Sequence, residues 1–448
     1  MARFILETKE KDIPPQLFTV VKNACLDNIG TMLAGSVQPV GRIINEYVRE
    51  SSGVPEATVV GTGFRTSATL AALANATMGH VLDYDDSSYW HATTSLLPAL
   101  LAAGEKANTS GMDILVAFVV GVEMASALCR EGKYDDYESG FHSTGLFGTM
   151  ASSAGAARLL GLKQEQTIMA LGIAASEACG LQRNNGTMTK PLHAGMACRN
   201  GVMAALLAKK GFTAYENIFE ARRGFCDVFL GRGRYNLDNI ADCLGNPFTF
   251  QDINTIKKYP CCGGNHTALD ATFALIKEHN IKYDDVVRVD VDTLSYTSPV
   301  IRFPDPKRGL EGKFSVRHCL ACAIMDGKVD IDSFTDEKVN DPKIKEAREK
   351  IFTYVVSGWD SRLDTGETRS NPVTITLKDG RQLSKKIDKR QMKGTATNPL
   401  SQEELVAKFK ANASLALPTR AVNQAIDPWL NLERVGNIAE ALKPVAGG

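Results

Sequence analysis

Four short segments place histidine beside acidic, basic or thiol side chains, and the chain has only seven histidines in 448 residues. The first segment runs from His80 to His91 and carries three acids within four positions, Asp83, Asp85 and Asp86. Carboxylates crowded around a histidine can orient it and tune it as an acid or base. The same residues could bind a divalent metal or lie solvated at a helix end, so three interpretations stay open.

The second segment brackets His142 between Gly140 and Gly145, ahead of an Ala/Gly-rich helix expected to begin near Thr149. Backbone amides at a helix start attract anions, which would place His142 beside a bound anion. The alternative is a helix-capping Ser or Thr with an incidental histidine.

The third segment holds Lys190 directly before Pro191, with His193 following. A residue before proline is restricted to extended backbone, so we expect a loop that projects Lys190 from the edge of the next helix. Taken alone, this could be an ordinary surface lysine.

The fourth segment contains Lys257, Cys261, Cys262 and His266 around a Gly-Gly pair. It could be a zinc ligand set or a loop that lines a cleft. Structural zinc sites use spaced pairs of ligands such as CxxC, and adjacent cysteines fit that pattern poorly. We therefore predict no metal site in this segment. For the CxxC pattern at 319–322, we predict a helix that faces the core.

Composition excludes several classes of function. Lys+Arg and Asp+Glu are 51 each, so the chain offers no excess of positive charge for nucleic acid or an anionic membrane surface. The sequence contains no Walker A, GxGxxG, GxSxG or HExxH motif. The apolar run at 114–127 is too short to span a bilayer and contains Glu123, which predicts a core helix. Ten cysteines in 448 residues are too few for a disulfide scaffold, and we find no signal-peptide pattern. We therefore expect reduced thiols in a cytoplasmic protein.

The pattern of hydrophobic residues divides the chain into a helical part and a mixed part. Residues 1–252 are Ala-rich with helical periodicity, and residues 253–397 contain alternating strand candidates, two helix candidates and an Asp379-Gly380 hairpin signal. Ser401 and Glu404 form a capping box that opens helices over 398–448. We predict a mainly α fold: a large helical domain completed by the C-terminal helices, with a smaller α+β lid domain inserted. The helices expected in the first part are Thr69–His80, Met112–Ala127, Thr149–Leu160, Gln164–Cys179 and Cys198–Lys209.

Five ordered blocks resemble the MmgE/PrpD family over almost the whole chain. They read GHVLDYDD with HATTSLLPALLA, GFHSTGLFGT, TKPLHAGMACRNGVMAALLAKKGF, KKYPCCGGNHTALDA and FSVRHCLACAIMDGKV. The family includes 2-methylcitrate dehydratases, cis-aconitate decarboxylases and iminodisuccinate epimerases. The resemblance implies the two-domain architecture described above, a homodimer, and activity without a metal or organic cofactor.

The resemblance also implies site residues. Positions of the cis-aconitate decarboxylase active site match Asp83, Ser87, His91, His142, Lys190 and Lys257 of this sequence, and Cys262 and His266 would line the substrate pocket with them. Three features depart from that branch: Ser87 replaces a threonine, Cys262 replaces a histidine, and the loop from Asp83 to His91 is about two residues shorter.

These residues suggest specific roles. His91 and His142 would transfer protons, Lys190 and Lys257 would anchor carboxylates, and Asp83 would orient His91 and raise its pKa. Protonated histidines would then make a cationic pocket in a protein of zero net charge.

The expected function is a cofactor-independent lyase, a dehydratase or decarboxylase, acting on a small di- or tricarboxylate by proton transfer next to a carboxylate. Two alternatives remain open. One is an epimerase of an amino- or imino-dicarboxylate such as iminodisuccinate, and the other is a non-catalytic polycarboxylate-binding protein.

Overall fold

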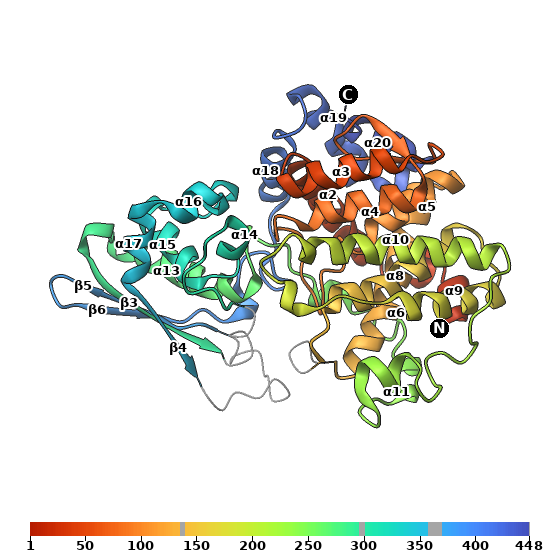
Figure 1. Ribbon diagram of the computed structural model, residues 1–448, viewed down its shortest axis with the longest axis horizontal. Coiled ribbons are helices and arrows are strands. Elements are labelled where there is room, and N and C mark those ends of the chain that lie inside the picture. Colours follow the sequence, from red (N-terminus) through yellow and green to blue (C-terminus); the bar gives the residue numbers. More distant parts are fainter. Residues whose placement is uncertain (135–138, 295–300, 357–369, 448) are drawn as a thin grey trace. The chain divides into compact units, whose positions relative to one another are not determined.

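The computed structural model describes residues 1–134, 139–294, 301–356 and 370–447 (Figure 1). The chain forms two compact units. The first unit comprises Met1–Arg183, Thr189–Ile256 and Ser401–Gly448, and the second comprises Asn184–Met188 and Lys257–Leu400.

The described residues of the first unit form helices and loops apart from a small hairpin of β1 (Ala57–Val59) and β2 (Phe64–Thr66). Its N-terminal helices are α1 (Ala2–Glu7), α2 (Pro15–Ser36), α3 (Pro39–Ser51), α4 (Ala68–His80) and α5 (Leu97–Ala107). They are followed by α6 (Gly111–Glu131), α8 (Ser143–Leu159), α9 (Gln164–Glu177), α10 (Thr189–Lys209), α11 (Leu237–Asp242) and α12 (Phe250–Ile253). The C-terminal helices are α18 (Gln402–Ala413), α19 (Thr419–Leu430) and α20 (Ile438–Leu442).

Small residues let helix α10 pack closely on α4 and α8 (Figure 1). A Cβ atom added at Gly195 would lie 2.1 Å from the Thr77 hydroxyl, and one added at Gly201 would lie 2.4 Å from the Ser152 Cβ. Both distances are far below van der Waals contact, so these positions require glycine. The close approach brings the first turn of α10 up to the ends of α4 and α8, where the candidate site lies.

Helix α6 is long and apolar enough to cross a membrane, but 89% of its most apolar 18-residue stretch is buried inside the protein. This burial agrees with the core helix expected from Glu123 and the short apolar run. Glu123 itself accepts backbone hydrogen bonds from Thr249 at 2.7 Å and Phe250 at 2.8 Å, which satisfies its buried carboxylate.

The C-terminal helices α18 and α19 pack on α2 at the other end of the sequence (Figure 1). The predicted capping box is present, since the Ser401 hydroxyl accepts from the Glu404 amide and Glu404 accepts from the Ser401 amide. A buried ion pair between Lys408 on α18 and Asp27 on α2, 2.7 Å apart, joins the two helices.

The second unit is built on a four-stranded sheet of order β4-β3-β5-β6. Its strands are β3 (Val286–Leu294), β4 (Ile351–Val356), β5 (Val373–Leu377) and β6 (Gln382–Lys385). Strand β3 pairs in parallel with β4 and antiparallel with β5, so Val289 lies between Ile351 and Ile375. The predicted hairpin turn joins β5 to β6, with Gly380 at φ +87°.

Helices α13 (His266–His279) and α15 (Val316–Asp326) pack on this sheet, and their apolar side chains share one buried core with β3 and β5. The unit also contains α14 (Gly309–Gly312), α16 (Asp336–Asn340) and α17 (Pro342–Glu349). Cys319 and Cys322 are both buried in this core, as expected for a core helix face.

The mainly α fold class is confirmed, but two helix starts differ from the prediction. Helix α8 begins at Ser143 rather than Thr149, and α10 begins at Thr189 rather than Cys198. Lys190 is therefore helical, and the extended loop predicted for it is wrong. Proline is tolerated in a first helical turn because its missing N–H needs no intrahelical acceptor there, so Pro191 does not delay the helix.

Candidate active site

The acidic cluster lies on the loop that connects α4 to α5, residues 81–96. Contacts with other segments of the first unit hold this loop in place. Asp83 adopts a left-handed backbone conformation, φ +51°, which aspartate tolerates better than most residues. Lys408 donates to the Tyr84 carbonyl at 2.9 Å and lies over the Tyr84 ring. Ser87 and Thr255 exchange two backbone hydrogen bonds of 2.9 Å. The loop is thus fixed on both sides of Asp85.

Asp86 holds the second half of the loop together. Its carboxyl contacts the Thr93 hydroxyl at 2.6 Å and accepts from the Thr93 amide at 3.2 Å. Burial raises the pKa of Asp86 to about 8, with the nearby Asp85 and Asp27 carboxylates adding to the effect and Thr93 opposing it. Asp86 is therefore a neutral group near pH 7.

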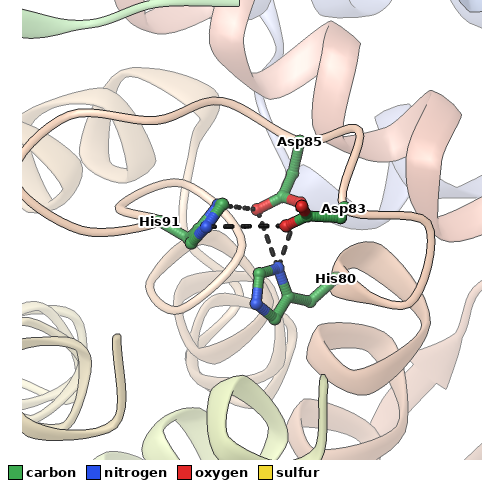
Figure 2. A group of neighbouring side chains, drawn as sticks. All are labelled: His80, Asp83, Asp85 and His91. Atoms are coloured by element: carbon green, nitrogen blue, oxygen red, sulfur yellow. Dashed lines mark hydrogen bonds and ion pairs between the residues drawn. The ribbon is translucent and has the colours of Figure 1, made fainter. Parts of the chain in front are cut away.

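Asp85 bridges two imidazoles (Figure 2). Its carboxylate lies 3.0 Å from Nδ1 of His80 and 2.9 Å from Nδ1 of His91. The side chain of Asp85 is fully buried, whereas that of His91 is 14% exposed. The Nδ1 atom of His91 also lies 3.0 Å from the Asp86 carbonyl, so two acceptors orient its ring.

Lys190 completes the cluster from the first turn of α10. Its ammonium donates to Asp83 at 2.8 Å and to Nε2 of His80 at 2.9 Å. Burial lowers the pKa of His80 to about 3, and the Lys190 charge adds to this effect while Asp85 opposes it. Neutral His80 then donates from Nδ1 to Asp85 and accepts from Lys190 at Nε2, so its tautomer is fixed.

Two further histidines lie beside this group. His142, the residue before α8, and His193 on α10 approach through their Nδ1 atoms, 3.1 Å apart. The ring centroid of His142 lies 6.1 Å from that of His80 and 6.4 Å from that of His91. Both are nearly buried, with 6% of His142 and 7% of His193 exposed.

Electrostatics make most of these groups uncharged. Burial, reinforced by Lys190, lowers the pKa of His142 well below its ordinary value and that of His193 to about 4. Burial opposes ionisation of Asp85, but its two histidine partners outweigh that effect and hold its pKa well below the usual range.

Three of the histidines, His80, His142 and His193, thus favour their neutral forms, whereas the sequence suggested protonated histidines. The ammonium of Lys190 pairs with the carboxylate of Asp83 at 2.8 Å. Burial disfavours the imidazolium forms of these three histidines.

Four of these residues have donor atoms close enough together to hold a metal ion. Ligand atoms of His80, Asp83, Asp85 and His91 all lie within 4.8 Å of one another. Lys190, however, already donates to an Asp83 oxygen and to Nε2 of His80. A divalent ion that used those two atoms would have to displace a buried ammonium, so the donor set fits a lysine better than a metal.

The predicted site residues divide between the two units. His91, His142, Asp83 and Lys190 come together in the first unit, and Ser87 lies on the same loop. Asp83 lies 3.7 Å from Nε2 of His91, farther than Asp85 from the same ring. Asp85, rather than Asp83, thus makes the close contact that orients His91.

The other predicted residues, Lys257, Cys262 and His266, belong to the second unit. Lys257 and His266 are buried and Cys262 is partly buried. Nε2 of His266, at the start of α13, lies 3.2 Å from the Cys261 carbonyl, and the Cys262 amide donates to the Lys313 carbonyl at 3.0 Å.

Sequence reasoning missed three residues of the cluster as candidates: His80, Asp85 and His193. Weak signals existed for two of them. His193 follows Lys190 by three positions, which places both side chains on one helix face, but the expected loop hid this relation. His80 lies three positions before Asp83, but nothing in the spacing distinguishes Asp85 from its acidic neighbours.

Fold and site together define a class of protein: a mainly helical enzyme with a buried cluster of histidine, aspartate and lysine. Two sequence profiles match the chain, that of the MmgE/PrpD N-terminal domain at residues 1–238 and that of the MmgE/PrpD C-terminal domain at residues 259–432. The chain belongs to the MmgE/PrpD family.

Relatives with known activities support the same assignment. The chain is 30% identical to a cis-aconitate decarboxylase of Homo sapiens, over 92% of this chain and 86% of the relative. It is 26% identical to a cis-aconitate decarboxylase of Aspergillus terreus, over 96% and 92%, and 23% identical to a 2-methylcitrate dehydratase of Salmonella typhimurium, over 92% and 86%. The chain is thus an enzyme of the lyase class, of the MmgE/PrpD type.

Proposed function

We propose that this lyase removes CO2 from a small tricarboxylate or dicarboxylate without a cofactor, by proton transfer next to a carboxylate. The observation that carries the proposal is the buried ammonium of Lys190 beside four imidazoles, two of which Asp85 orients. A buried ammonium can bind a carboxylate, and an oriented imidazole can deliver a proton.

Each residue has a chemical role in this reaction. Lys190 anchors a substrate carboxylate, and the anchoring role that the family resemblance implies for Lys257 stays a prediction. The breaking C–C bond leaves its electron pair on carbon as CO2 departs, and that carbon then takes a proton from His91 or His142. His91 has the stronger case as donor, because Asp85 and the Asp86 carbonyl lie at its Nδ1 and favour its imidazolium form, in which Nε2 carries the proton that the carbon takes.

Similarity favours decarboxylation over dehydration. Identity reaches 30% with a cis-aconitate decarboxylase but 23% with a 2-methylcitrate dehydratase. Dehydration remains a second candidate because it needs a base for the C–H proton and an acid for the departing hydroxide, and the ring centroids of His91 and His142 are 6.4 Å apart.

A mass-based screen tests the proposal. The enzyme is incubated with about thirty di- and tricarboxylates, cis-aconitate and 2-methylcitrate among them. A product lighter by the mass of CO2 supports decarboxylation, and one lighter by the mass of water identifies a dehydratase. Deuterium uptake from D2O with no loss of mass would instead indicate an epimerase.

A variant of His91 links any turnover to the site. His91→Ala is expected to lower kcat on the order of 10²- to 10⁴-fold, the usual contribution of a general acid or base. Lys210→Met, an exposed change just beyond α10, is the control. Near-normal turnover by His91→Ala would remove His91 from the reaction.

We also propose a homodimer, which the family resemblance supports, and a cytoplasmic location. Light scattering coupled to size exclusion tests the dimer, and fractionation of the source cells tests the location. A monomeric mass in dilute solution would contradict the first.

A further inference from the structure

His193 has no part in the reaction described above, although it is the nearest imidazole neighbour of His142. The two Nδ1 atoms are 3.1 Å apart, within hydrogen-bond distance, and both residues are more than nine-tenths buried. The ring centroids are 5.3 Å apart and the rings are tilted by 55°. An approach through two nitrogens is a specific contact, unlike the stacking of two rings.

The surrounding backbone holds both rings in this position. The His142 amide donates to the Gly180 carbonyl at 3.0 Å, which fixes the start of α8 against residues 179–181. Gly180 in turn lies against His193: its φ is +131°, and a Cβ atom there would lie 3.0 Å from Cγ of the imidazole. The same short segment therefore positions His142 through its backbone and His193 through ring contact.

Helix α10 couples His193 to the rest of the cluster. Lys190 and His193 are three positions apart in its first turn, so their side chains lie on one face. Lys190 contacts His80 and Asp83, while His193 contacts His142. The first turn of α10 thus contacts both the His80–Asp83 pair and His142.

A hydrogen bond between two Nδ1 atoms allows only one proton between them. Two lone pairs would repel, and so would two N–H groups, so one ring must donate and the other accept. Both rings are neutral near pH 7, because burial and the charge of Lys190 lower their pKa values. A neutral imidazole carries one ring proton, so the direction of this bond decides which nitrogen of His142 is protonated.

We propose that His193 is a positioning residue that donates its Nδ1 proton to Nδ1 of His142 and so keeps the proton of neutral His142 on Nε2. The inference rests on the proposed function, in which an acid must deliver a proton to carbon after CO2 leaves. In this arrangement His142 is prepared as a proton donor before the substrate binds.

Nitrogen NMR of 15N-histidine-labelled enzyme tests the proposal without any substrate. The seven histidines make the spectrum tractable, and the signals lost in His142→Gln and His193→Phe assign the pair. We expect a protonated Nε2 and an unprotonated, hydrogen-bonded Nδ1 for His142, with a protonated Nδ1 for His193. A His142 protonated on Nδ1, or a His142 spectrum unchanged in His193→Phe, would overturn the proposal.

Kinetics with two variants test the consequence. His193→Phe keeps a ring but cannot donate, and we expect it to lower kcat about 10-fold with little change in KM, the effect of losing one neutral hydrogen bond. His193→Asn places an amide donor near the Nδ1 position and should recover at least a third of wild-type kcat. Equal impairment in both variants, or normal kcat in His193→Phe, would contradict a positioning role.

The two experiments separate this inference from the proposed function. If no carboxylate is turned over but the NMR pattern is as expected, the proposed function fails and the hydrogen bond stands. If turnover is found but the His142 proton is on Nδ1, the proposed function stands and the role of His193 is wrong. Circular dichroism and thermal unfolding of both variants confirm that the fold is retained.

Discussion

Replacing Asp85 by asparagine changes one oxygen of the carboxylate into an amide donor. The wild-type side chain accepts from Nδ1 of both His80 and His91. Nδ1 of His80 lies 3.0 and 3.1 Å from the two carboxylate oxygens, whereas Nδ1 of His91 contacts one of them, at 2.9 Å. Asparagine can place either its oxygen or its NH2 group on the His91 side. His80 cannot turn its tautomer around easily, because its Nε2 accepts from the Lys190 ammonium at 2.9 Å. In either orientation His91 loses its bond to a charged carboxylate, and with the NH2 group on its side it loses this acceptor altogether.

The size of the effect follows from the second acceptor of His91. The Asp86 carbonyl lies 3.0 Å from Nδ1 of His91 and remains in the variant, so this tautomer is still supported. The loss is one hydrogen bond to a charged group, about 1.5–3 kcal/mol, which corresponds to a roughly 10- to 150-fold fall in kcat. A fall of about 10⁴-fold, as when a catalytic imidazole loses its sole carboxylate partner, is not expected.

Steady-state kinetics on the substrate found by the mass screen measure this effect. Asp252→Asn, at an exposed aspartate of α12, is the matched control and should leave kcat within about twofold of wild type. A kcat for Asp85→Asn within threefold of wild type would refute the reasoning that Asp85 orients a catalytic His91. A loss of the same size in Asp252→Asn would show that the effect is not specific to the cluster.

Three further predictions follow from the charges of the cluster. Lys190→Met should raise KM at least 10-fold and lower the free energy of unfolding by about 3 kcal/mol, because it removes the ammonium that pairs with the buried Asp83. Urea unfolding measures the stability, and the control variant Lys210→Met should change neither KM nor stability. Asp86→Asn should become more stable relative to wild type as pH rises, since folded Asp86 keeps its proton up to pH about 8 while the unfolded chain loses it near pH 4. The gain between pH 4 and 8 is at most about 5 kcal/mol in urea unfolding, and a pH-independent difference would contradict a raised pKa for Asp86. Substrate or inhibitor binding should take up protons near pH 6.5, because an anion raises the lowered pKa values of His80 and His193. Calorimetry in buffers of different ionisation enthalpy measures this uptake, and proton release would contradict it.

The sequence was sufficient to predict the mainly α fold, because the spacing of hydrophobic residues and the composition both change clearly where the helical part ends and the strands begin. Local signals such as the Ser401 capping box and the Asp379-Gly380 turn were reliable, since the physics that they report is local. The start of α10 was not predicted, because the rule for the residue before proline competes with the tolerance of proline in a first turn, and here the second prevailed.

The chemistry of the cluster was harder to predict than its membership. The spacing of Asp83, Asp85 and Asp86 cannot show which acid contacts a histidine, since that depends on the left-handed turn at Asp83 and on Lys408 from the far end of the chain. Burial likewise lowers the pKa values of His80, His142 and His193, and burial of a polar loop cannot be inferred from its composition. The raised pKa of Asp86 and the lowered pKa of His80 both follow from tertiary packing.

The central claim is that an imidazole of this cluster delivers a proton to the carbon that loses CO2. The most direct measurement is turnover in D2O, followed by mass spectrometry and NMR of the product. The account predicts a product that has lost CO2 and carries one carbon-bound deuterium per turnover, with both events slowed together in His91→Ala. Loss of CO2 with no deuterium on carbon, or deuterium incorporation at the wild-type rate in a variant lacking both His91 and His142, would contradict it.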